Sequence, residues 1–390
     1  MILKTILKTL LSIVLVVVAL VLFLQSITKI YSFSESGKPF AGDSIYFPYQ
    51  GVDWNQPLMK ANFHAHTKVD VNGDYTAEQF RAAYDSSAYD IIGIAEHQII
   101  NPLGDIPSYE HGWGFNNFHI LMLGSTKVDW LDNPLMMMPS HQMQYSIERL
   151  RHKTTLLSLN HPERWRHFAW ENIAHLRGFD LVEMNPSLDP RPWDLLLSNG
   201  YYAPIIASDD SHSITNRLSW FQRCYTMVAT EADQLINALQ KGKSYGVIVP
   251  VEINLKGCHK EFPVVKSVDF RNDTLTVRLS ELADSIIFIG QNGMTKLIAM
   301  DTDSASYHFE SKDTYIRAEG HLRGGIIIRL NPLFRGEWSP EGWSSNEAIA
   351  PVNYWLTTLN AIAWSLGGVV VLLLLIPLWK KRNKKRRFRR

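Results

Sequence analysis

Uninterrupted apolar stretches mark both ends of the 390-residue chain. No residue from 9 to 28 is charged, and Leu, Val and Ile dominate there; the stretch from 351 to 379 is equally free of charge. About 20 apolar residues suffice to cross the hydrocarbon core of a bilayer as a helix. The pattern therefore predicts a transmembrane anchor within residues 1–29 and a transmembrane helix over 351–379. No small-x-small cleavage site follows the first stretch, which favours an uncleaved anchor over a signal peptide.

Short apolar runs alternate with helix-like stretches over residues 60–246. The runs 89–95 and 155–159 are typical of buried strands. Residues 76–84 have a helical pattern, in which Thr76 is placed to cap the helix and Gln79 to complete a capping box. This order of strand, helix and strand predicts a parallel α/β barrel, whose functional residues gather at the carboxyl ends of the strands.

From residue 247 the pattern changes to short alternating runs. They are separated by turn dipeptides, among them Asn272-Asp273 and Asn292-Gly293 at hairpin positions. The pattern predicts a small antiparallel β domain, resembling a sandwich, over 247–350. Residues 30–59 have no strong periodicity and form a lead-in segment from the membrane, which we expect to pack on the barrel.

Basic residues flank both apolar stretches on their outer sides. Lys4 and Lys8 precede the first, and a basic tail over 380–390 follows the second. The positive-inside rule then puts both termini in the cytoplasm and the intervening part outside the cell membrane. We expect the tail to set this topology, to contact anionic inner-leaflet lipid, or to do both.

The intervening part has a charge of its own that differs from that of the whole chain. Without Lys4, Lys8 and the nine basic tail residues, 28 basic residues face 38 acidic ones, a charge of −10. Such a surface does not bind nucleic acid nonspecifically. The two cysteines, Cys224 and Cys258, could pair in an oxidising compartment, but they are too few for a thiolate metal site.

Histidines and carboxylates recur in short motifs, most of them at the ends of apolar runs. Eleven of the 14 histidines fall between His64 and His212. Side chains two apart on a strand point the same way, so that His64 and His66, or Asp210 and His212, can bind one ion together. The set predicts a multinuclear metal site. Its motifs are His64-Ala65-His66, Glu96-His97, Glu110, His119, Asn160-His161-Pro162 and Asp210-Ser211-His212.

In type and order these motifs resemble those of the polymerase and histidinol phosphatase (PHP) family. Its members open with His-x-His-Thr, here residues 64–67, and continue with Thr-Asp-His, here Ala95-Glu96-His97. A Glu, a His near a Leu-Gly, a His-Pro and a closing Asp-x-His follow. The resemblance implies a distorted (β/α)7 barrel over 60–246, a centre of two or three divalent ions, and phosphoester hydrolysis. The implied ligands are His64, His66, Asp70, His97, Glu110, His119, His161, Asp210 and His212.

The chain departs from the family pattern at three places. Asn62 stands where Asp commonly precedes the first His, and Glu96 replaces the usual Asp. The early Asp ligand of the family falls on Val71; Asp70 lies one place before it and Asp74 three places after, and Asp70 is the preferred candidate. Without either, we expect a dinuclear rather than a trinuclear centre.

The ligand types indicate the chemistry. An ion lowers the pKa of its bound water, and neighbouring ions neutralise the phosphoryl oxygens, so a metal-bound hydroxide is the expected nucleophile. Glu110 can bridge two ions through its two oxygens, and Zn, Mn and Fe all accept this mixture of imidazole and carboxylate. We assign catalytic roles to Glu110, Asp210 and His212.

Three further residues are candidates for contact with the substrate. His111 adjoins Glu110, and Arg217 and Arg223 follow the last motif, where a guanidinium could hold a phosphate; a surface salt bridge is the alternative role for either arginine. Glu183 and Asn185 end another predicted strand, and either a pocket or a structural role fits them.

These features together predict a membrane-anchored, outward-facing, metal-dependent phosphoesterase. Its substrate would be a phosphomonoester or phosphodiester, either a small molecule or part of the cell envelope. One alternative is a non-catalytic, metal-containing sensory or binding module. Another is an amidohydrolase, which also combines a barrel with His-x-His, although no metal-bridging Lys stands at a suitable strand end.

Overall fold

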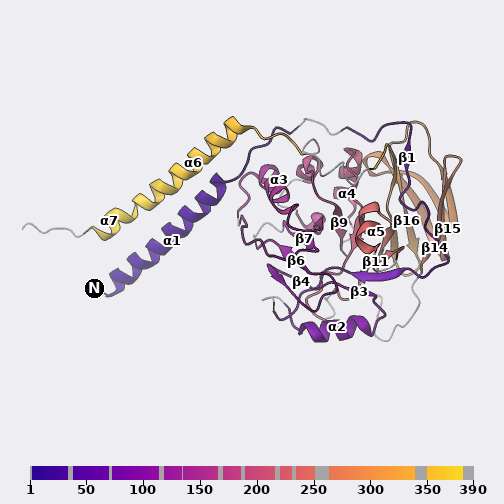
Figure 1. Ribbon diagram of the computed structural model, residues 1–390, viewed down its shortest axis with the longest axis horizontal. Coiled ribbons are helices and arrows are strands. Elements are labelled where there is room, and N and C mark those ends of the chain that lie inside the picture. The colour runs from indigo at the N-terminus through magenta and orange to yellow at the C-terminus, as the bar shows by residue number, and fades with distance from the viewer. Residues whose placement is uncertain are drawn as a thin grey trace, which may run out of the picture.

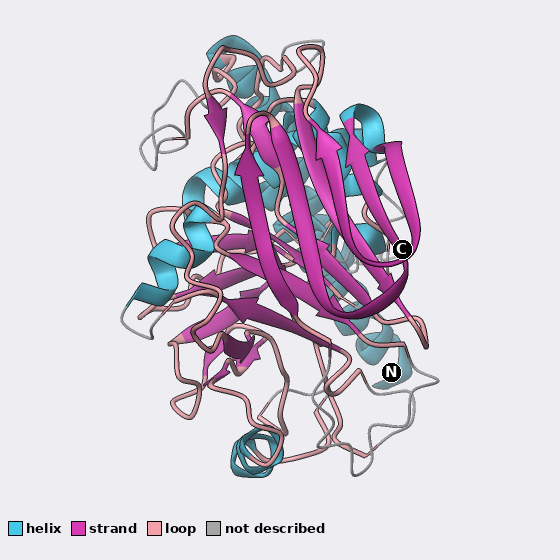
Figure 2. Ribbon diagram, turned by 90° about the vertical axis from the view of Figure 1, so that its right-hand side faces the viewer, coloured by secondary structure: helices cyan, strands magenta, loops and turns pink. Residues whose placement is uncertain are grey.

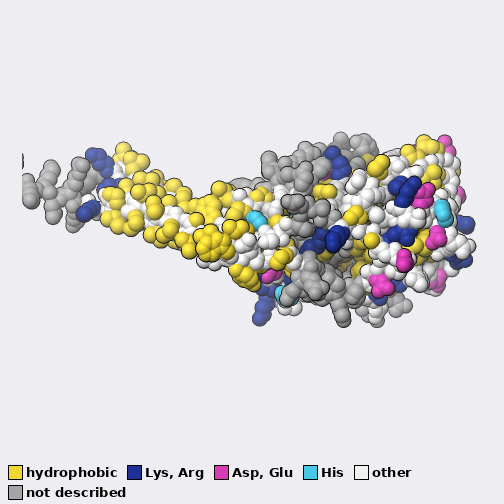
Figure 3. Space-filling view, turned by 90° about the horizontal axis from the view of Figure 1, so that it is seen from above, with side chains coloured by type: hydrophobic (Ala, Val, Ile, Leu, Met, Phe, Trp, Pro, Cys, Tyr) yellow, Lys and Arg dark blue, Asp and Glu magenta, His cyan; other side chains and the backbone are white. Residues whose placement is uncertain are grey.

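Two apolar helices stand apart from a globular part that is built mostly of strands (Figure 1). The computed structural model describes residues 2–33, 38–69, 73–113, 118–133, 135–165, 170–185, 189–215, 220–230, 234–250, 263–338 and 349–380. The helices are α1 (Ile2–Ser26) and α6 (Tyr354–Leu373), which continues into α7 (Leu375–Trp379). Both spans are long and apolar enough to cross a membrane, as the sequence predicts. On the face seen in Figure 3, hydrophobic side chains line the pair along most of its length up to the globular part.

The two spans run antiparallel and are tied together at both ends. Lys8 Nζ donates to the carbonyl of Leu378 at 2.6 Å, and Trp379 Nε1 donates to Ser12 Oγ at 2.8 Å. At the other end, the backbone N–H of Ile30 donates to the hydroxyl of Thr357 at 2.9 Å. The N-terminus and the end of α7 therefore lie together at the end of the pair that is far from the strands (Figure 1).

An 11-stranded sheet forms the larger half of the globular part and curls into a half barrel. Its path runs β1-β18-β16-β17-β12-β11-β2-β3, and β13, β14 and β15 extend it from β16. Figure 2 shows the strands of the globular part in magenta. Its strands are β1 (Ile45–Tyr46), β2 (Met59–Asn62), β3 (Ile91–Ile92), β11 (Cys224–Val228), β12 (Ser244–Ile248), β13 (Val265–Arg271), β14 (Thr274–Gly290), β15 (Met294–His308), β16 (Tyr315–Leu322), β17 (Ile327–Leu330) and β18 (Leu333–Arg335).

A five-stranded sheet in the order β10-β9-β8-β7-β6 forms the other half. Its strands are β6 (Ser108–His111), β7 (Ile120–Leu123), β8 (Leu156–Leu159), β9 (Leu181–Met184) and β10 (Ile205–Ala207), and the pair β4 (Ala95–Glu96) and β5 (Ile99–Ile100) lies beside it. The helices of the globular part are α2 (Ala77–Asp85), α3 (Pro139–Leu150), α4 (Arg191–Ser198) and α5 (Leu235–Lys241), with short 3-10 turns η1 (Pro162–Arg164), η2 (Trp170–His175) and η4 (Gln291–Gly293).

The prediction of a (β/α)7 barrel is wrong. Only the pairs β2–β3, β8–β9 and β9–β10 are parallel among the named strands, whereas β6, β7 and β8 pair antiparallel, as do β2, β11 and β12. Residues 112–119, which join β6 to β7, are too few for the crossover of a dozen or more residues that parallel strands need. Apolar runs specify buried strands without specifying their direction, so the sequence pattern was compatible with a barrel that the chain does not form.

The strands after residue 247 continue the large sheet. β12 pairs with both β11 and β17, which links these strands directly to β2. The predicted hairpins are confirmed: Asn272 and Asp273 turn between β13 and β14 at φ of 48° and 55°, and Asn292 and Gly293 turn between β14 and β15. The alternating segments 274–279 and 285–289 both belong to one long strand, β14.

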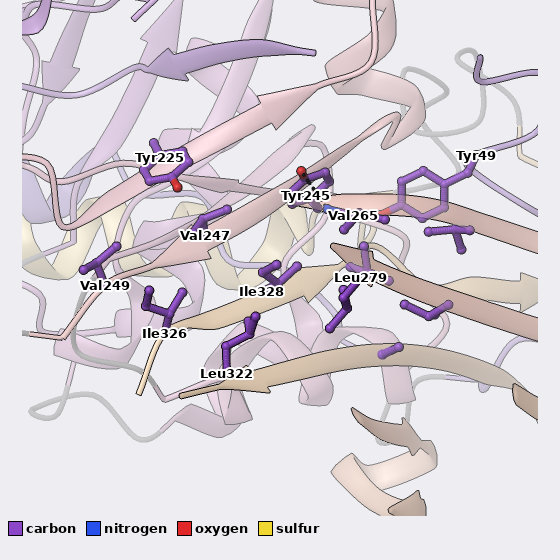
Figure 4. Close-up of a cluster of buried hydrophobic side chains, with 14 of the residues drawn as sticks. Tyr49, Tyr225, Tyr245, Val247, Val249, Val265, Leu279, Leu322, Ile326 and Ile328 are labelled. Atoms are coloured by element: carbon purple, nitrogen blue, oxygen red, sulfur yellow. Dashed lines mark hydrogen bonds between the residues drawn. The ribbon is translucent and has the colours of Figure 1, made fainter. Parts of the chain in front are cut away.

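The main core lies against the concave large sheet and shares residues from most of its strands. Figure 4 shows part of it, with Tyr225, Tyr245 and Val247 from β11 and β12 facing Ile328 and Leu322. All five are buried. Helix α2 adds Phe80 and Tyr84, and its N-terminus has the predicted capping box between Thr76 and Gln79.

Asp180, just before β9, is a buried carboxyl whose loss of a proton destabilises the folded chain. It accepts the N–H of Leu157 at 2.8 Å, and burial raises its pKa to about 7. The folded chain holds this proton between about pH 4 and pH 7 while the unfolded chain loses it, so stability falls across that window by at most about 4 kcal/mol. We expect Asp180→Asn to reduce this loss of stability with rising pH and to raise the melting temperature at pH 8. Identical pH profiles of thermal unfolding would contradict this.

Some predicted features lie outside the described residues. They are the candidate ligand Asp70, the candidate substrate contact Arg217, Cys258 and the tail after Lys380. Cys224 is buried on β11, and its pairing with Cys258 stays a prediction.

Candidate metal centre

The seam between the two sheets brings together the motifs that the sequence singled out. Ala65, just beyond β2, forms a parallel bridge with Ser211, just beyond β10, and His97 forms another with Glu110 on β6. The N–H of His66 donates to the carbonyl of Ser211 at 2.8 Å, and that of Ala95 donates to Ala65 at 3.0 Å. Strand ends from both sheets thus meet in one place, and the side chains they carry converge.

The first group of converging side chains is fully buried. It consists of His64, His66, Glu110 and Asp210. The two histidine Nε2 atoms lie 3.0 Å apart, and each lies 3.3 Å from Glu110 Oε2. Asp210 Oδ1 lies 3.4 Å from the His64 nitrogen and 3.1 Å from that of His66. Four potential ligand atoms therefore surround one small space.

A second group shares Glu110 with the first. His97 Nδ1 lies 3.3 Å from Glu110 Oε2, and His119 Nδ1 lies 3.1 Å from Oε1. His161 Nε2 is 3.2 Å from the same Oε1 and 4.0 Å from Asp210 Oδ2. One carboxylate consequently faces ring nitrogens of five histidines from different parts of the chain, as a bridging ligand would.

These distances fit bound metal ions. Ligand atoms about 2.1 Å from one tetrahedral ion are about 3.4 Å from each other, close to the separations of the first group. Two Nε2 atoms facing each other at 3.0 Å need a proton or a cation between them, since two lone pairs repel. The donor set of imidazole and carboxylate is one that zinc, manganese and iron accept.

Electrostatics around Glu110 and Asp210 point the same way. Burial alone would raise the pKa of Glu110, but the imidazoles of His119, His64 and His97 hold it well below its usual range. Asp210 is buried too, and His64 and Arg164 keep its pKa low. Burial would lower the pKa of His64, yet the carboxylates of Glu110, Glu183 and Asp210 raise it well above its usual range. The carboxylates of Glu110 and Asp210 are therefore held ionised, and they favour positive charge between them.

Two ligand candidates have unusual backbone conformations. His161 has φ 31° and ψ 54°, and Asp210 has φ 45°, in the left-handed region that residues with a Cβ rarely adopt. Each such residue costs on the order of 1–3 kcal/mol, and such strain gathers at functional sites. The tight turns after β8 and β10 direct both side chains toward Glu110.

Outer contacts fix the ligands in place. Glu183 on β9 lies 2.9 Å from Nδ1 of His64, so that Nε2 of that ring faces the centre. Asn160 donates to Glu110 Oε1 at 2.8 Å. Of the two strand-end residues with open roles, Glu183 therefore lies beside the centre and orients a ligand.

Two of the three departures from the family pattern, Asn62 and Glu96, fall on supporting residues. Asn62 donates to the carbonyl of His64 at 3.1 Å and accepts the N–H of Asp209 at 3.0 Å, while Tyr84 donates to Asp209 at 2.8 Å. Glu96 accepts the N–H of Thr67 at 2.8 Å, accepts the hydroxyl of the same residue, and binds Asn101. Both changes thus alter the scaffold around the ligands.

The remaining candidates lie in different surroundings. The His212 ring stacks on that of His66 at 4.3 Å, with Nδ1 bonded to the carbonyl of Asp210. His111 alternates with Glu110 on β6 and points to the opposite face, where Gln98 lies 3.1 Å away; burial lowers its pKa to about 4. Arg223 donates to the carbonyl of Pro250 at 2.5 Å.

The structure adds one residue that sequence reasoning missed. Arg164, in η1, donates to Asp210 Oδ2 at 2.7 Å, and its guanidinium lies 4.0 Å from the ring centre of Trp220. Its side chain is about one-third exposed, so it borders both the centre and solvent. The signal in the sequence is its position three residues after His161, in the turn that follows β8.

Comparisons with known proteins do not identify a relative of this chain. No protein-family model matches the chain, and no curated protein matches it.

Proposed function

We propose that the chain is a metal-dependent phosphoesterase anchored in a membrane by α1 and α6–α7. The observation that carries the proposal is the position of Glu110, whose two oxygens face both ligand groups. His64, His66 and Asp210 would hold one ion and His97 and His119 another, with His161 near both Glu110 and Asp210. A third ion stays part of the proposal through Asp70.

Bound divalent ions would activate water and neutralise phosphoryl charge, which is the chemistry that phosphoester cleavage needs. The residues of the chain supply the rest. Glu110 and Asp210 bring negative charge to bind the ions, while the neutral imidazoles keep the loaded centre cationic. Glu183 orients His64, and burial keeps bulk water from His64 and His66. The catalytic roles of Glu110, Asp210 and His212 belong to this proposal.

The order of the motifs supports a relation to the PHP family, as part of the same proposal. The (β/α)7 barrel that the resemblance implies is absent from the described residues, so the ligand set carries the argument rather than the fold.

The proposed orientation has both termini in the cytoplasm and the metal centre outside. The pairing of the two spans supports it, since Lys4, Lys8 and Lys380 belong to the same end of the helix pair and the positive-inside rule applies to that end as a whole.

The test uses the full chain purified in detergent. Metal content is measured by mass spectrometry, and hydrolysis is followed with p-nitrophenyl phosphate and bis-p-nitrophenyl phosphate, for the wild type and for His64→Ala and Asp210→Ala. We expect bound metal and hydrolysis of at least one ester, with both lost in the variants. Bound metal without hydrolysis of either ester would favour the non-catalytic metal-containing module; a metal-free protein would overturn both.

We propose that Arg164, which borders both Asp210 and solvent, contacts the substrate phosphate. Arg164→Lys keeps the charge but removes the planar fork that matches phosphate, so we expect KM to rise about tenfold while kcat changes little. Steady-state kinetics on the better aryl phosphate measure this. Arg191→Lys, at an exposed ion pair with Asp189, is the control and should leave both constants unchanged. A fall in kcat at constant KM would refute a role in substrate binding.

A further inference from the structure

A loop between β7 and α3 exposes large apolar side chains beside the helix pair. Trp130 is 71% exposed and Met137 is 57% exposed, and Leu131 and Leu135 are also open to solvent. A soluble surface seldom gathers such residues without a partner. We therefore expect another surface to cover the exposed apolar side chains of this loop.

The loop is fastened to the end of the first span. Gln25, in the last turn of α1, donates to Asn133 Oδ1 at 2.8 Å and to the carbonyl of Leu135 at 3.0 Å. Gln142 of α3 donates in turn to Gln25 Oε1 at 2.9 Å. Gln25 is fully buried in these contacts. The apolar loop is thus held at the level where α1 leaves its apolar stretch, which is the membrane surface if α1 spans a bilayer.

The same loop reaches the accessible edge of the metal centre. Asp132 Oδ2 accepts the N–H of Trp113 at 2.7 Å, and the Trp113 ring lies 6.1 Å from that of His97. The side chains of His97 and His119 are 13% and 14% exposed, whereas His64 and His66 are fully buried. Solvent therefore approaches the centre on the side of Trp113, which is itself exposed.

We propose that Trp113 and the loop residues 130–133 and 135–137 lie in the interfacial layer of the bilayer, and that the metal centre hydrolyses the phosphoester headgroup of a lipid in that bilayer. The occupant is the membrane because the apolar surface continues from α1, and Trp is a side chain that prefers the headgroup level. The docking part stands on this geometry alone; the lipid substrate rests on the proposed phosphoesterase function.

The reaction balances with water as the only co-reactant. A water oxygen bonds to phosphorus, the bond from phosphorus to the lipid oxygen breaks, and a proton ends on the released lipid hydroxyl. With phosphatidic acid the products are diacylglycerol and inorganic phosphate. A lipid held at the level of Trp113 would present its phosphate to the edge at His97 without leaving the membrane.

The first arm of the test measures docking without activity. Full-length protein carrying Cys258→Ser, whose other cysteine Cys224 is buried, receives either Met137→Cys or Met300→Cys and an environment-sensitive fluorophore. Met300 is 64% exposed and serves as the matched control; its strand, β15, lies on the side of the globular part away from the helix pair (Figure 1). In phosphatidylcholine nanodiscs with nitroxide-labelled lipid, we expect strong quenching at 137 and little at 300. Equal quenching at both positions would overturn the docking.

The second arm of the test compares hydrolysis of the same ester in a bilayer and in solution. Dioleoyl phosphatidic acid and dioleoyl phosphatidylglycerol in the nanodisc are compared with their dibutyryl forms in solution. We expect the double variant Trp130→Ser/Met137→Ser to hydrolyse a bilayer lipid about tenfold more slowly, the equivalent of about 1.4 kcal/mol. Its rate on the soluble form should fall by less than about twofold. Met300→Ser should leave both rates unchanged.

The outcomes separate the two proposals. Quenching at 137 with no hydrolysis of any ester would leave the docking standing and refute the phosphoesterase. Hydrolysis of aryl phosphates and dibutyryl esters but of neither bilayer lipid would refute the lipid substrate alone. An equal loss on the soluble and bilayer forms in the double variant would show damage to the centre and overturn the assigned role of the loop.

Discussion

Glu110→Gln should abolish activity and strip metal from the protein while leaving it folded. The amide keeps the size of the side chain and removes the charge that both ligand groups share. Loss of an outer partner of a ligand already costs about 10–100-fold in metal affinity or activity, so loss of the bridging ligand itself should exceed about 100-fold. The measurements are metal content by mass spectrometry and hydrolysis of the better aryl phosphate.

The matched control is Asp180→Asn, which also turns a buried carboxyl into its amide. Asp180 lies in neither ligand group and bonds to Leu157 and Gln240. We expect it to retain full metal content and activity. If Glu110→Gln kept its metal and its rate, the shared-carboxylate centre would be refuted; if both variants lost activity equally, general damage to the core would explain the result.

The contrast between site and fold shows what the sequence could reveal. Imidazole and carboxylate motifs can be recognised in the sequence by residue type. They meet at the seam because most of them lie just beyond the end of a strand, while Glu110 lies on β6 and His119 just before β7. Strand direction has no such signature. β11 and β12 are joined through α5 and still pair antiparallel, although a strand, a helix and a strand in this order also occur between parallel strands.

Two residues that were predicted to contact the substrate because they are close to a ligand in sequence, His111 and Arg223, do not face the metal centre. His111 adjoins Glu110 but faces away from it, as the alternation of strand side chains requires. Arg223 follows the last motif yet bonds to Pro250. Arg164 contacts Asp210 because it lies in the turn after β8, and its position three residues after His161 is the one sequence signal of this contact.

The largest expected loss of stability comes from a buried charge network that joins the two halves of the globular part. Arg317 on β16 of the large sheet is 1% exposed and binds Asp194 of α4 through two bonds of 2.7 Å. Its third nitrogen donates to Glu319 at 2.5 Å, which also accepts from Arg329 at 2.9 Å. Burial would raise the pKa of Glu319, but the two arginines hold it well below its usual range.

Arg317→Met fills a similar volume and leaves Asp194 facing Glu319 without the cation between them. Removing one partner of such a buried group costs about 3–5 kcal/mol, because the carboxylate left behind stays desolvated and unpaired. We expect a fall of that size in the free energy of unfolding, measured by denaturant titration of the full chain in detergent. Arg271→Met, at an exposed pair with Asp269, removes the same charge from the surface and should change stability by less than about 1 kcal/mol. Equal effects of the two substitutions would mean that the network contributes nothing beyond a surface ion pair, and that packing alone holds α4 against β16.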